Sequence, residues 1–269
     1  AVEQQNLART ICEVLYPNDN HMAGKELRLK QQYFFVSASV QRAIMKYMEN
    51  HNDIHGLPEK VCFQLNDTHP TVTVPELMRI LLDEYGLEWD DAWDITTRTC
   101  AYTNHTIMAE ALEKWPIGFL EKAVPQLMPI IRELDNRVRA KVSDESTYII
   151  KDGLVHMAHM DIHYGYSVNG VAYLHTEILK NSELNNFYKL YPEKFNNKTN
   201  GITFRRWLLH CNPALTELLD ELIGEGYKKD AAELEKLLAF KDDEKVLDRL
   251  VEIKHANKEA PVSYTHLRA

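Results

Sequence analysis

The sequence predicts an α/β protein that is rich in helix. A short apolar, β-favouring run at residues 61–65 leads into a polar loop and then into a helical pattern at residues 75–85. Long helical patterns also cover residues 24–48 and 214–255, and the Asp152-Gly153 pair between two apolar runs is typical of a hairpin turn. Strand, loop and helix in succession form the unit of α/β folds, in which ligands bind at the carboxyl ends of the strands.

The first part of the chain is expected to contain two helices joined by a polar loop. Apolar residues recur with helical spacing over residues 2–15, and Pro17 ends that pattern. Residues 16–21 are prone to form turns, since Asn and Asp side chains bond nearby backbone amides. The apolar positions of residues 24–48 are spread widely, which predicts a buried helix that packs on several sides.

After the first strand, a helix is predicted to end at Gly86, and Asp90 is expected to cap the next helical pattern. Residues 101–106 (Ala-Tyr-Thr-Asn-His-Thr) are interpreted as a polar loop that enters a helix at residues 109–115, where good helix formers follow one another. The bunched donors and acceptors of this loop suit a neutral ligand with many hydroxyl groups, such as a sugar.

The rest of the chain is predicted to be mostly helical. Residues 117–142 are expected to form helix with breaks at Pro125 and Pro129, and residues 169–180 form a further helical pattern. The pair Asn200-Gly201 predicts a backbone position with positive φ, and we place the domain boundary there, between residues 199 and 200.

Composition narrows the class of protein. The chain has 269 residues and a formal net charge of -9, which disfavours nucleic acid and anionic membranes as non-specific partners. Its four cysteines are far apart, as in a reduced, cytoplasmic protein. The first residues include no initiator Met and no signal peptide, so we expect an internal fragment.

Two carboxylates present the first candidate site. Glu110 and Glu113 lie three residues apart, which would place them on one face of the predicted helix, as in the acid/base pair of a glycoside hydrolase. The simpler interpretation is an exposed acidic face paired with Lys114, because such spacings are common on helix surfaces. We favour the exposed face.

A histidine-rich segment is the second candidate site. His156, His159 and His163 have a spacing that permits a zinc site on a helix, but no Glu stands in the HExxH position. The apolar residues between them favour a buried segment whose histidines are hydrogen-bonded. We therefore expect no metal.

Loop residues give the third candidate. Asp67 and His69 follow the predicted strand and His105 lies in the polar loop, so an Asp is available to orient a His. Caps and turn bonds explain the same residues equally well. The sequence contains no GxSxG, GxGxxG or GxxxxGK[ST] motif.

Five motifs, taken together, closely resemble the glycogen/starch α-glucan phosphorylase family in order and spacing. They are Tyr16-Pro17-Asn18-Asp19-Asn20, residues 24–31 (GKELRLKQ), residues 64–70 (QLNDTHP), residues 102–106 (YTNHT) and residues 197–203 (NKTNGIT). The resemblance implies reversible phosphorolysis of a terminal α-1,4-linked glucose to glucose 1-phosphate, on a glycosyltransferase fold of two Rossmann-like domains. Residues 1–199 would be the later part of the sugar-binding domain, residues 200–260 the opening helices of the cofactor domain, and residues 261–269 a tail outside the family pattern.

The resemblance also implies residue roles. His105 would hold the glucosyl unit while its carbonyl faces the developing positive charge, and Asp67 would orient it. The other implied positions are a gate loop at Asn18 with Arg28 nearby, and substrate contacts at Asp19, Asn20, His69, Thr106, Glu110 and Asn200.

Pyridoxal phosphate is the implied cofactor, with its lysine and the phosphate-binding residues outside this chain. We therefore expect no cofactor-binding residue and no activity in the fragment alone. The implied partners are α-1,4-glucan and phosphate, and the implied assembly is a homodimer when full length. A non-catalytic glucan-binding module and a glycoside hydrolase are the competing interpretations.

Overall fold

The computed structural model describes residues 2–108 and 112–268, except for the side chains of Val2, Leu7 and residues 262–268. The chain divides into two compact units, one that ends at Asn200 and one that begins at Gly201. This division lies one residue after the boundary that we predicted. The identities given above to the two parts and to the tail remain predictions.

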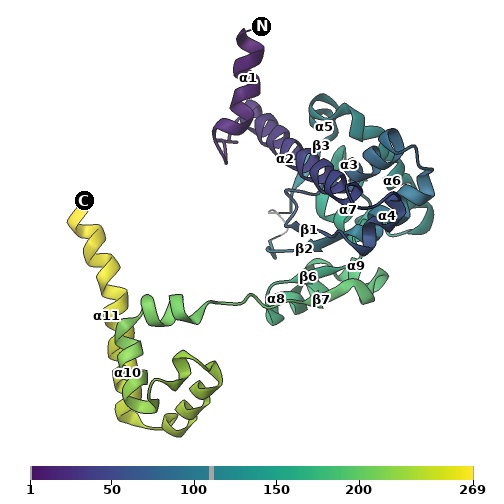
Figure 1. Ribbon diagram of the computed structural model, residues 1–269. Helices are drawn as coiled ribbons and strands as arrows, with labels where there is room; N and C mark the ends of the chain where they lie inside the picture. Colours follow the sequence, from purple (N-terminus) through teal and green to yellow (C-terminus); the bar gives the residue numbers. More distant parts are fainter. Residues whose placement is uncertain (1, 109–111, 269) are drawn as a thin grey trace. The chain divides into compact units, whose positions relative to one another are not determined.

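A four-stranded parallel sheet organises the first unit (Figure 1). Its strands are β1 (Phe63–Asn66), β2 (Cys100–Thr103), β6 (Val168–Gly170) and β7 (Phe195–Asn197), in that spatial order. Because every pair is parallel, the carboxyl ends of all these strands lie along the same edge. The loops that leave this edge carry most of the polar motifs noted above.

A second, smaller sheet is antiparallel, with β5 (Leu154–His156) between β3 (Lys114–Pro116) and β4 (Ile150–Lys151). The predicted hairpin is confirmed, since β4 and β5 flank a turn in which Asp152 and Gly153 have φ values of 52° and 74°. Gly and Asp are the residues that adopt this left-handed conformation at low cost.

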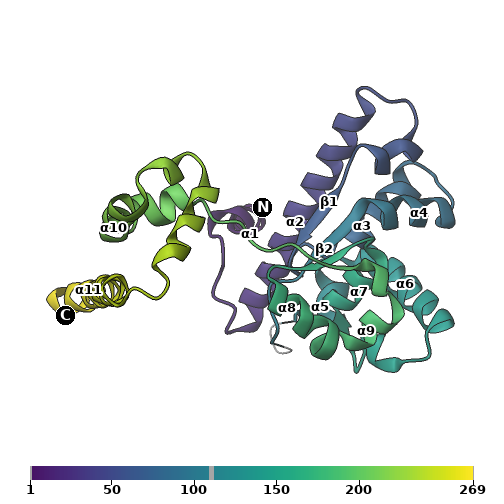
Figure 2. The same ribbon diagram turned by 90° about the horizontal axis from the view of Figure 1, so that it is seen from below.

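Helices of the first unit pack around α3 (Thr73–Arg79), which contacts α2 (Met22–Met48), α4 (Trp89–Thr99), α6 (Met128–Lys141) and α7 (Met157–Tyr164). In Figure 2, α2 runs along one side of the unit and α4 and α6 lie on the other. The remaining helices are α1 (Val2–Glu13), α5 (Ile117–Ala123), α8 (Tyr173–Ile178) and α9 (Asn185–Leu190); π-helical turns at Ile80–Glu84 and Leu179–Glu183 extend α3 and α8.

The helix α2 buries one face along most of its length. Leu29, Val36, Val40 and Ile44 have almost no exposed surface, and their spacing is that of one helical stripe. Phe34, Phe35 and Met45 on the opposite side are about half exposed. Gln31 on that side is nevertheless buried and donates to the carbonyl of Val14 at 2.6 Å, so the predicted packing on several sides is confirmed for the first turns of α2 but not for the later ones.

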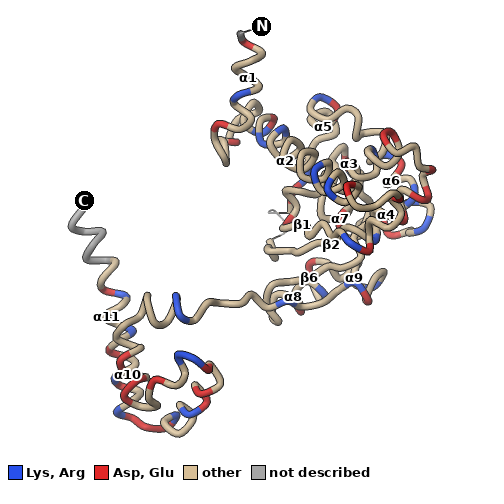
Figure 3. The backbone as a smooth tube through the Cα atoms, viewed as in Figure 1, with Lys and Arg blue, Asp and Glu red and all other residues tan. Residues whose placement is uncertain are grey.

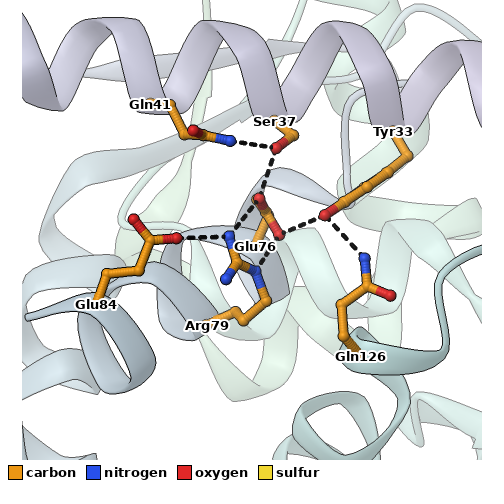
Figure 4. A network of polar contacts seen from close by, with 7 residues as sticks. All are labelled: Tyr33, Ser37, Gln41, Glu76, Arg79, Glu84 and Gln126. Atoms are coloured by element: carbon orange, nitrogen blue, oxygen red, sulfur yellow. Dashed lines mark hydrogen bonds and ion pairs between the residues drawn. The ribbon is translucent and has the colours of Figure 1, made fainter. Parts of the chain in front are cut away.

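A buried carboxylate joins α2 to α3 (Figure 4). Glu76 has no exposed surface, and it accepts hydrogen bonds from the Arg79 guanidinium at 2.9 and 3.0 Å, from Ser37 at 2.7 Å and from Tyr33 at 3.1 Å. The charge of Arg79 compensates that of Glu76, and both carboxylate oxygens are hydrogen-bonded. This network fixes the position of α2 relative to the helix that follows β1.

The second unit is helical, as predicted for residues 214–255. It contains a π-helical segment at Arg205–His210, α10 (Pro213–Ile223), 3-10 turns at Gly226–Lys228 and Ala231–Phe240, and α11 (Glu244–Arg268). Asn212 caps α10 by accepting the amide N–H of Leu215 at 3.3 Å. Acidic and basic residues are interspersed along the backbone of each unit (Figure 3).

Four local predictions were wrong. Residues 101–103 belong to strand β2 rather than to a loop, and residues 114–116 form β3 rather than the end of a helix, because each segment pairs with a neighbouring strand. Asn169 lies in β6, so the predicted helix begins later, at Tyr173. Asp90 lies inside α4, whose N-cap is Glu88, and pairs with Arg137 at 2.8 Å.

Two further predictions concern prolines and Gly201. Pro125 separates α5 from α6 as expected, whereas Pro129 lies in the first turn of α6, where its missing N–H costs nothing. Gly201 does not have a positive φ, and residues 198–203 form neither helix, strand nor turn. Among the described helices, none is both long and apolar enough to span a membrane.

Candidate functional site

Polar segments leave the carboxyl edge of the parallel sheet side by side. Residues 67–70 follow β1, residues 104–108 follow β2 and residues 198–200 follow β7. The backbone links the first two, since the amide N–H of Asp67 donates to the carbonyl of Thr103 at 2.9 Å. The predicted site residues of these three segments therefore lie along one edge of the sheet, which is where α/β folds bind ligands.

The loop between α1 and α2 is fixed by local hydrogen bonds. The Asn18 side chain accepts the amide N–H of Asn20 at 3.0 Å, and His21 caps α2 by accepting the amide N–H of Gly24, also at 3.0 Å. Gly24 allows this arrangement, because a β-carbon there would lie 1.8 Å from the carbonyl oxygen of Asn18. The loop thus rests directly on the first turn of α2.

Arg28 connects this loop to the sheet. One of its nitrogens, Nη1, donates to Asp19 Oδ2 at 2.7 Å, and this bond lowers the pKa of the Asp19 carboxyl below its usual value. The other, Nη2, lies 3.4 Å from His69 Nδ1. The structure thus brings together three residues that the sequence analysis assigned to the site from separate motifs.

Glu113 completes the group. Its carboxylate lies 3.6 Å from Arg28 and 3.6 Å from His69, and it accepts a hydrogen bond from the Gln32 amide at 2.9 Å. Only 11% of its side chain is exposed. The favoured prediction of an exposed acidic face was therefore wrong for Glu113, and we call Asp19, Arg28, Gln32, His69 and Glu113 the charged cluster.

His69 has two competing partners at the same atom. An unprotonated Nδ1 accepts a hydrogen bond from Arg28, whereas a protonated Nδ1 pairs with Glu113. The nearby Glu113 carboxylate raises the pKa of His69, while partial burial and the charge of Arg28 oppose that effect. His69 is half exposed, so a ligand can reach its ring.

Asp67 and His105 are not joined. Asp67 has a left-handed backbone with a φ of 64°, and its side chain accepts the amide N–H of Thr68 at 2.7 Å. No hydrogen bond links it to His105 in the part of the chain that the structure describes. The direct contact by which Asp67 would orient His105 is thus not seen here, because the Asp67 side chain accepts a hydrogen bond within its own turn.

The loop after β2 depends on Asn104. This residue is fully buried, and its Oδ1 accepts the amide N–H of Thr106 at 3.0 Å. Thr106 Oγ1 in turn accepts the amide N–H of Met108 at 3.1 Å. The side chain of His105, between them, is exposed, whereas the predicted site residue Glu110 lies outside the described residues.

The buried side chain of Asn104 is held by residues from other strands and helices. Its Nδ2 donates to the buried hydroxyl of Tyr102 at 3.0 Å, and its Oδ1 lies 3.0 Å from His175 Nε2. His175 Nδ1 accepts the amide N–H of Val171 at 3.1 Å. We call Tyr102, Asn104, Thr106, Val171 and His175 the neutral cluster.

Asn200 also reaches this region through its backbone. Its amide N–H donates to the carbonyl of Val171 at 2.9 Å, while its side chain is exposed. The backbone of Asn200 and the turn that carries His105 are therefore both hydrogen-bonded to residues that follow β6, and both side chains are exposed.

The histidine-rich segment is largely buried, and two of its three histidines, His159 and His163, are hydrogen-bonded as favoured from the sequence. His159 Nδ1 bonds the carbonyl of Tyr148 at 2.7 Å, and His163 bonds Tyr191 and the carbonyl of Thr147, both at 2.8 Å. Burial lowers the pKa of His159 to about 3 and that of His163 to about 4. In the described part of the chain, no group of His, Cys, Asp or Glu has the arrangement of a metal site.

A cleft of about 220 Å³ opens beside the charged cluster. Apolar side chains form most of its wall, and Arg28, Gln32 and His69 lie at its polar side. Gln32 and His175 were not predicted as parts of this region, and Glu113 was considered only as one of a pair of carboxylates on a helix. Gln32 is 81 residues from Glu113 in the chain, and His175 is 71 residues from Asn104, so no local pattern reports either contact.

Comparisons with known proteins agree with the motifs. The family model of carbohydrate phosphorylases matches residues 1–268. The chain is 55% identical over 257 residues to the maltodextrin phosphorylase of Streptococcus pneumoniae serotype 4, covering 95% of this chain and 34% of that protein. It is 47% identical over 278 residues to the muscle form of human glycogen phosphorylase, covering 96% of this chain and 33% of that protein.

The chain thus spans about a third of the length of the curated relatives it matches. The family match covers the parallel sheet, all the loops at its carboxyl edge and both clusters. Motifs, fold and comparisons lead to one conclusion: this chain belongs to the carbohydrate phosphorylase family.

Proposed function

We propose that this chain forms the sugar-binding side of an α-1,4-glucan phosphorylase active site, at which a terminal glucose is transferred reversibly to phosphate. One observation carries the proposal: the segments at residues 18–20, 67–69, 104–106 and 198–200, assigned to the sugar from separate motifs, are linked along the carboxyl edge of one parallel sheet. The family of the chain supplies the reaction class.

His105 is the proposed contact to the reacting glucose. Its side chain is exposed, and the turn at Asn104 and Thr106 holds its backbone in place on both sides. A carbonyl dipole fixed near a developing oxocarbenium ion stabilises the transition state without reorganisation, and one such group typically contributes about 3–4 kcal/mol. Asn200 and Thr106 are proposed to bond glucose hydroxyls.

The charged cluster is proposed to control access. Asp19 is tied to Arg28, which in turn lies beside His69, so a shift of the loop at Asn18–Asn20 changes the charges that face the site. A phosphorylase must exclude water so that phosphate captures the glucosyl group, and closure of a loop serves that purpose. Asn20 and Glu110 are proposed as further contacts, and Asp67 as a wall of the site.

Pyridoxal phosphate is the proposed cofactor of the whole enzyme, supplying a phosphate group for proton exchange with substrate phosphate. Among the described residues, Lys194 is a half-buried lysine whose pKa burial lowers to about 8, but it does not fit the cofactor. Its ammonium donates to the carbonyls of Ile162 and His163 at 3.0 and 2.9 Å. We infer that the cofactor is held by other parts of the enzyme and that this chain alone is inactive.

The whole enzyme is proposed to act on α-1,4-glucan and phosphate in the cytoplasm, as a homodimer. A chimera tests the reaction: this chain replaces the matching third of the Streptococcus pneumoniae relative, and products from maltodextrin are measured with and without phosphate. Phosphate-dependent release of glucose 1-phosphate is expected. Release of free glucose without phosphate would indicate a glycoside hydrolase, and glucan binding without any product would indicate a binding module.

The cofactor inference has a separate test. Pyridoxal phosphate and then borohydride are added to this chain alone, and its mass is measured. We expect no stoichiometric adduct, whereas a specific adduct on one lysine would contradict the inference.

A further inference from the structure

We propose that His175 is a positioning residue for the proposed reaction. In this view His175 holds the His105–Thr106 turn through the side chain of Asn104. The inference rests on the proposed function only for its effect on turnover. The hydrogen bonds that carry it are independent of the reaction.

The tautomer of His175 follows from its two partners. The amide N–H of Val171 donates to Nδ1 at 3.1 Å, so Nδ1 carries no proton. A neutral imidazole has one donor and one acceptor, and Nε2 is therefore the donor that faces Asn104 Oδ1 at 3.0 Å. His175 thus aims one N–H at the residue that shapes the turn.

Asn104 transmits this constraint to the turn. Its Oδ1 accepts both the Nε2–H of His175 and the amide N–H of Thr106, while its Nδ2 donates to Tyr102. Because Asn104 is fully buried, water cannot replace a missing partner, and a lost hydrogen bond must be compensated by movement. Thr106 and the adjacent His105 would then shift.

Val171 is also hydrogen-bonded to a second segment that is proposed to contact the sugar. The carbonyl of Val171 accepts the amide N–H of Asn200 at 2.9 Å, while its amide N–H donates to His175. His175 and its partner Val171 therefore join the His105 turn to the Asn200 segment. A single side chain sets the spacing between two proposed glucose contacts.

Two substitutions separate the two hydrogen bonds of His175. In His175→Gln, the amide nitrogen occupies the position of Nε2 and retains the bond to Asn104. In His175→Asn, the amide oxygen occupies the position of Nδ1 and retains the bond from Val171, but the donor to Asn104 is lost. If the turn depends on Asn104, the Asn variant is the more damaging of the two.

The test uses the chimera described above. We expect His175→Asn to lower kcat roughly 10–100-fold with a smaller change in KM, as for a transition-state contact that is misplaced. His175→Gln should retain most of the turnover. The control is His163→Asn, which alters a buried, doubly hydrogen-bonded histidine of the same unit and should leave kcat unchanged.

Hydrogen exchange at the Thr106 amide gives a readout besides turnover. Faster exchange is expected in His175→Asn, with exchange close to that of the parent in His175→Gln and His163→Asn. Equal kcat values and equal exchange in the two His175 variants would overturn the inference. An inactive parent chimera would instead refute the proposed function, and the exchange result would still decide the role of His175.

Discussion

On the β1 side of the sheet, Arg28 lies among two carboxylates and an imidazole, whereas on the β2–β6 side the His105 turn depends on Asn104 and a neutral imidazole. The charged cluster is partly exposed and has alternative partners, as His69 shows. The neutral cluster is largely buried and each of its hydrogen bonds has a single arrangement. The comparison indicates that one side of the site is built to respond to pH and salt, and the other to keep a fixed geometry.

The largest expected effect comes from the network that anchors the charged side. Glu76→Gln removes a buried charge and leaves Arg79 without its main partner, so we expect the free energy of unfolding to fall by about 3–5 kcal/mol in urea titrations. Glu84→Gln is the control, because it removes the more exposed partner of the same Arg79 and should cost less than about 1 kcal/mol. Equal losses in the two variants would contradict the account.

A pair of glycines tests the support of the loop. Gly24→Ala drives a β-carbon into the carbonyl of Asn18, so we expect a loss of about 1–3 kcal/mol in unfolding free energy and displacement of Asp19 from Arg28. Gly118→Ala, in open space within α5, should instead stabilise the protein by about 0.5–1 kcal/mol. Stabilisation by both substitutions would show that the loop does not rest on Gly24.

Titration of His69 tests the electrostatics of the charged side. The pKa of His69 is raised in the folded protein. The interaction of His69 with Glu113 therefore contributes its full stabilisation of the folded state below the unfolded pKa of about 6.5, and this stabilisation is lost as the pH rises through the folded pKa. Nuclear magnetic resonance should show that Glu113→Gln lowers the pKa of His69. The control is Glu26→Gln, which removes the carboxylate that pairs with Lys30 and Lys122, and it should leave the pKa of His69 unchanged.

The smallest expected effect is that of salt, which should shift the pKa of His69 on the charged side and leave the neutral side unchanged. At 1 M NaCl the Debye length falls to about 3 Å, so the pKa of His69 should move toward its ordinary value. Exchange at the Thr106 amide should not change, because its hydrogen bond joins neutral groups. A salt-dependent Thr106 amide would remove the distinction between the two clusters.

The sequence predicted the elements whose signals are local. Residues 24–48 and 75–85 have long periodic patterns, and Asp152-Gly153 has the turn chemistry that its backbone requires. Strand β6, by contrast, has three residues and ends in Gly170, which is too short for any alternation. Strand β3 begins with Lys114, a good helix former, and its pairing with β5 overrides that preference.

The site was predictable to a similar degree. Motifs identified Asp19, Arg28, His69 and His105, each beside a turn signal in the sequence. Contacts between distant residues were not predictable, because the positions of Glu113 and His175 depend on how strands and helices pack. The direct Asp67–His105 contact is not seen in the structure, and the sequence does not report the direction in which each of these side chains points.

Hydrogen exchange of the chimera, measured with and without glucose 1-phosphate, decides whether the loops of the two sides form one sugar site. The ligand should slow exchange together in residues 18–20, 66–70 and 104–108, on both the charged and the neutral side. Slowed exchange on one side only, or in neither while turnover continues, would contradict the proposal of one site.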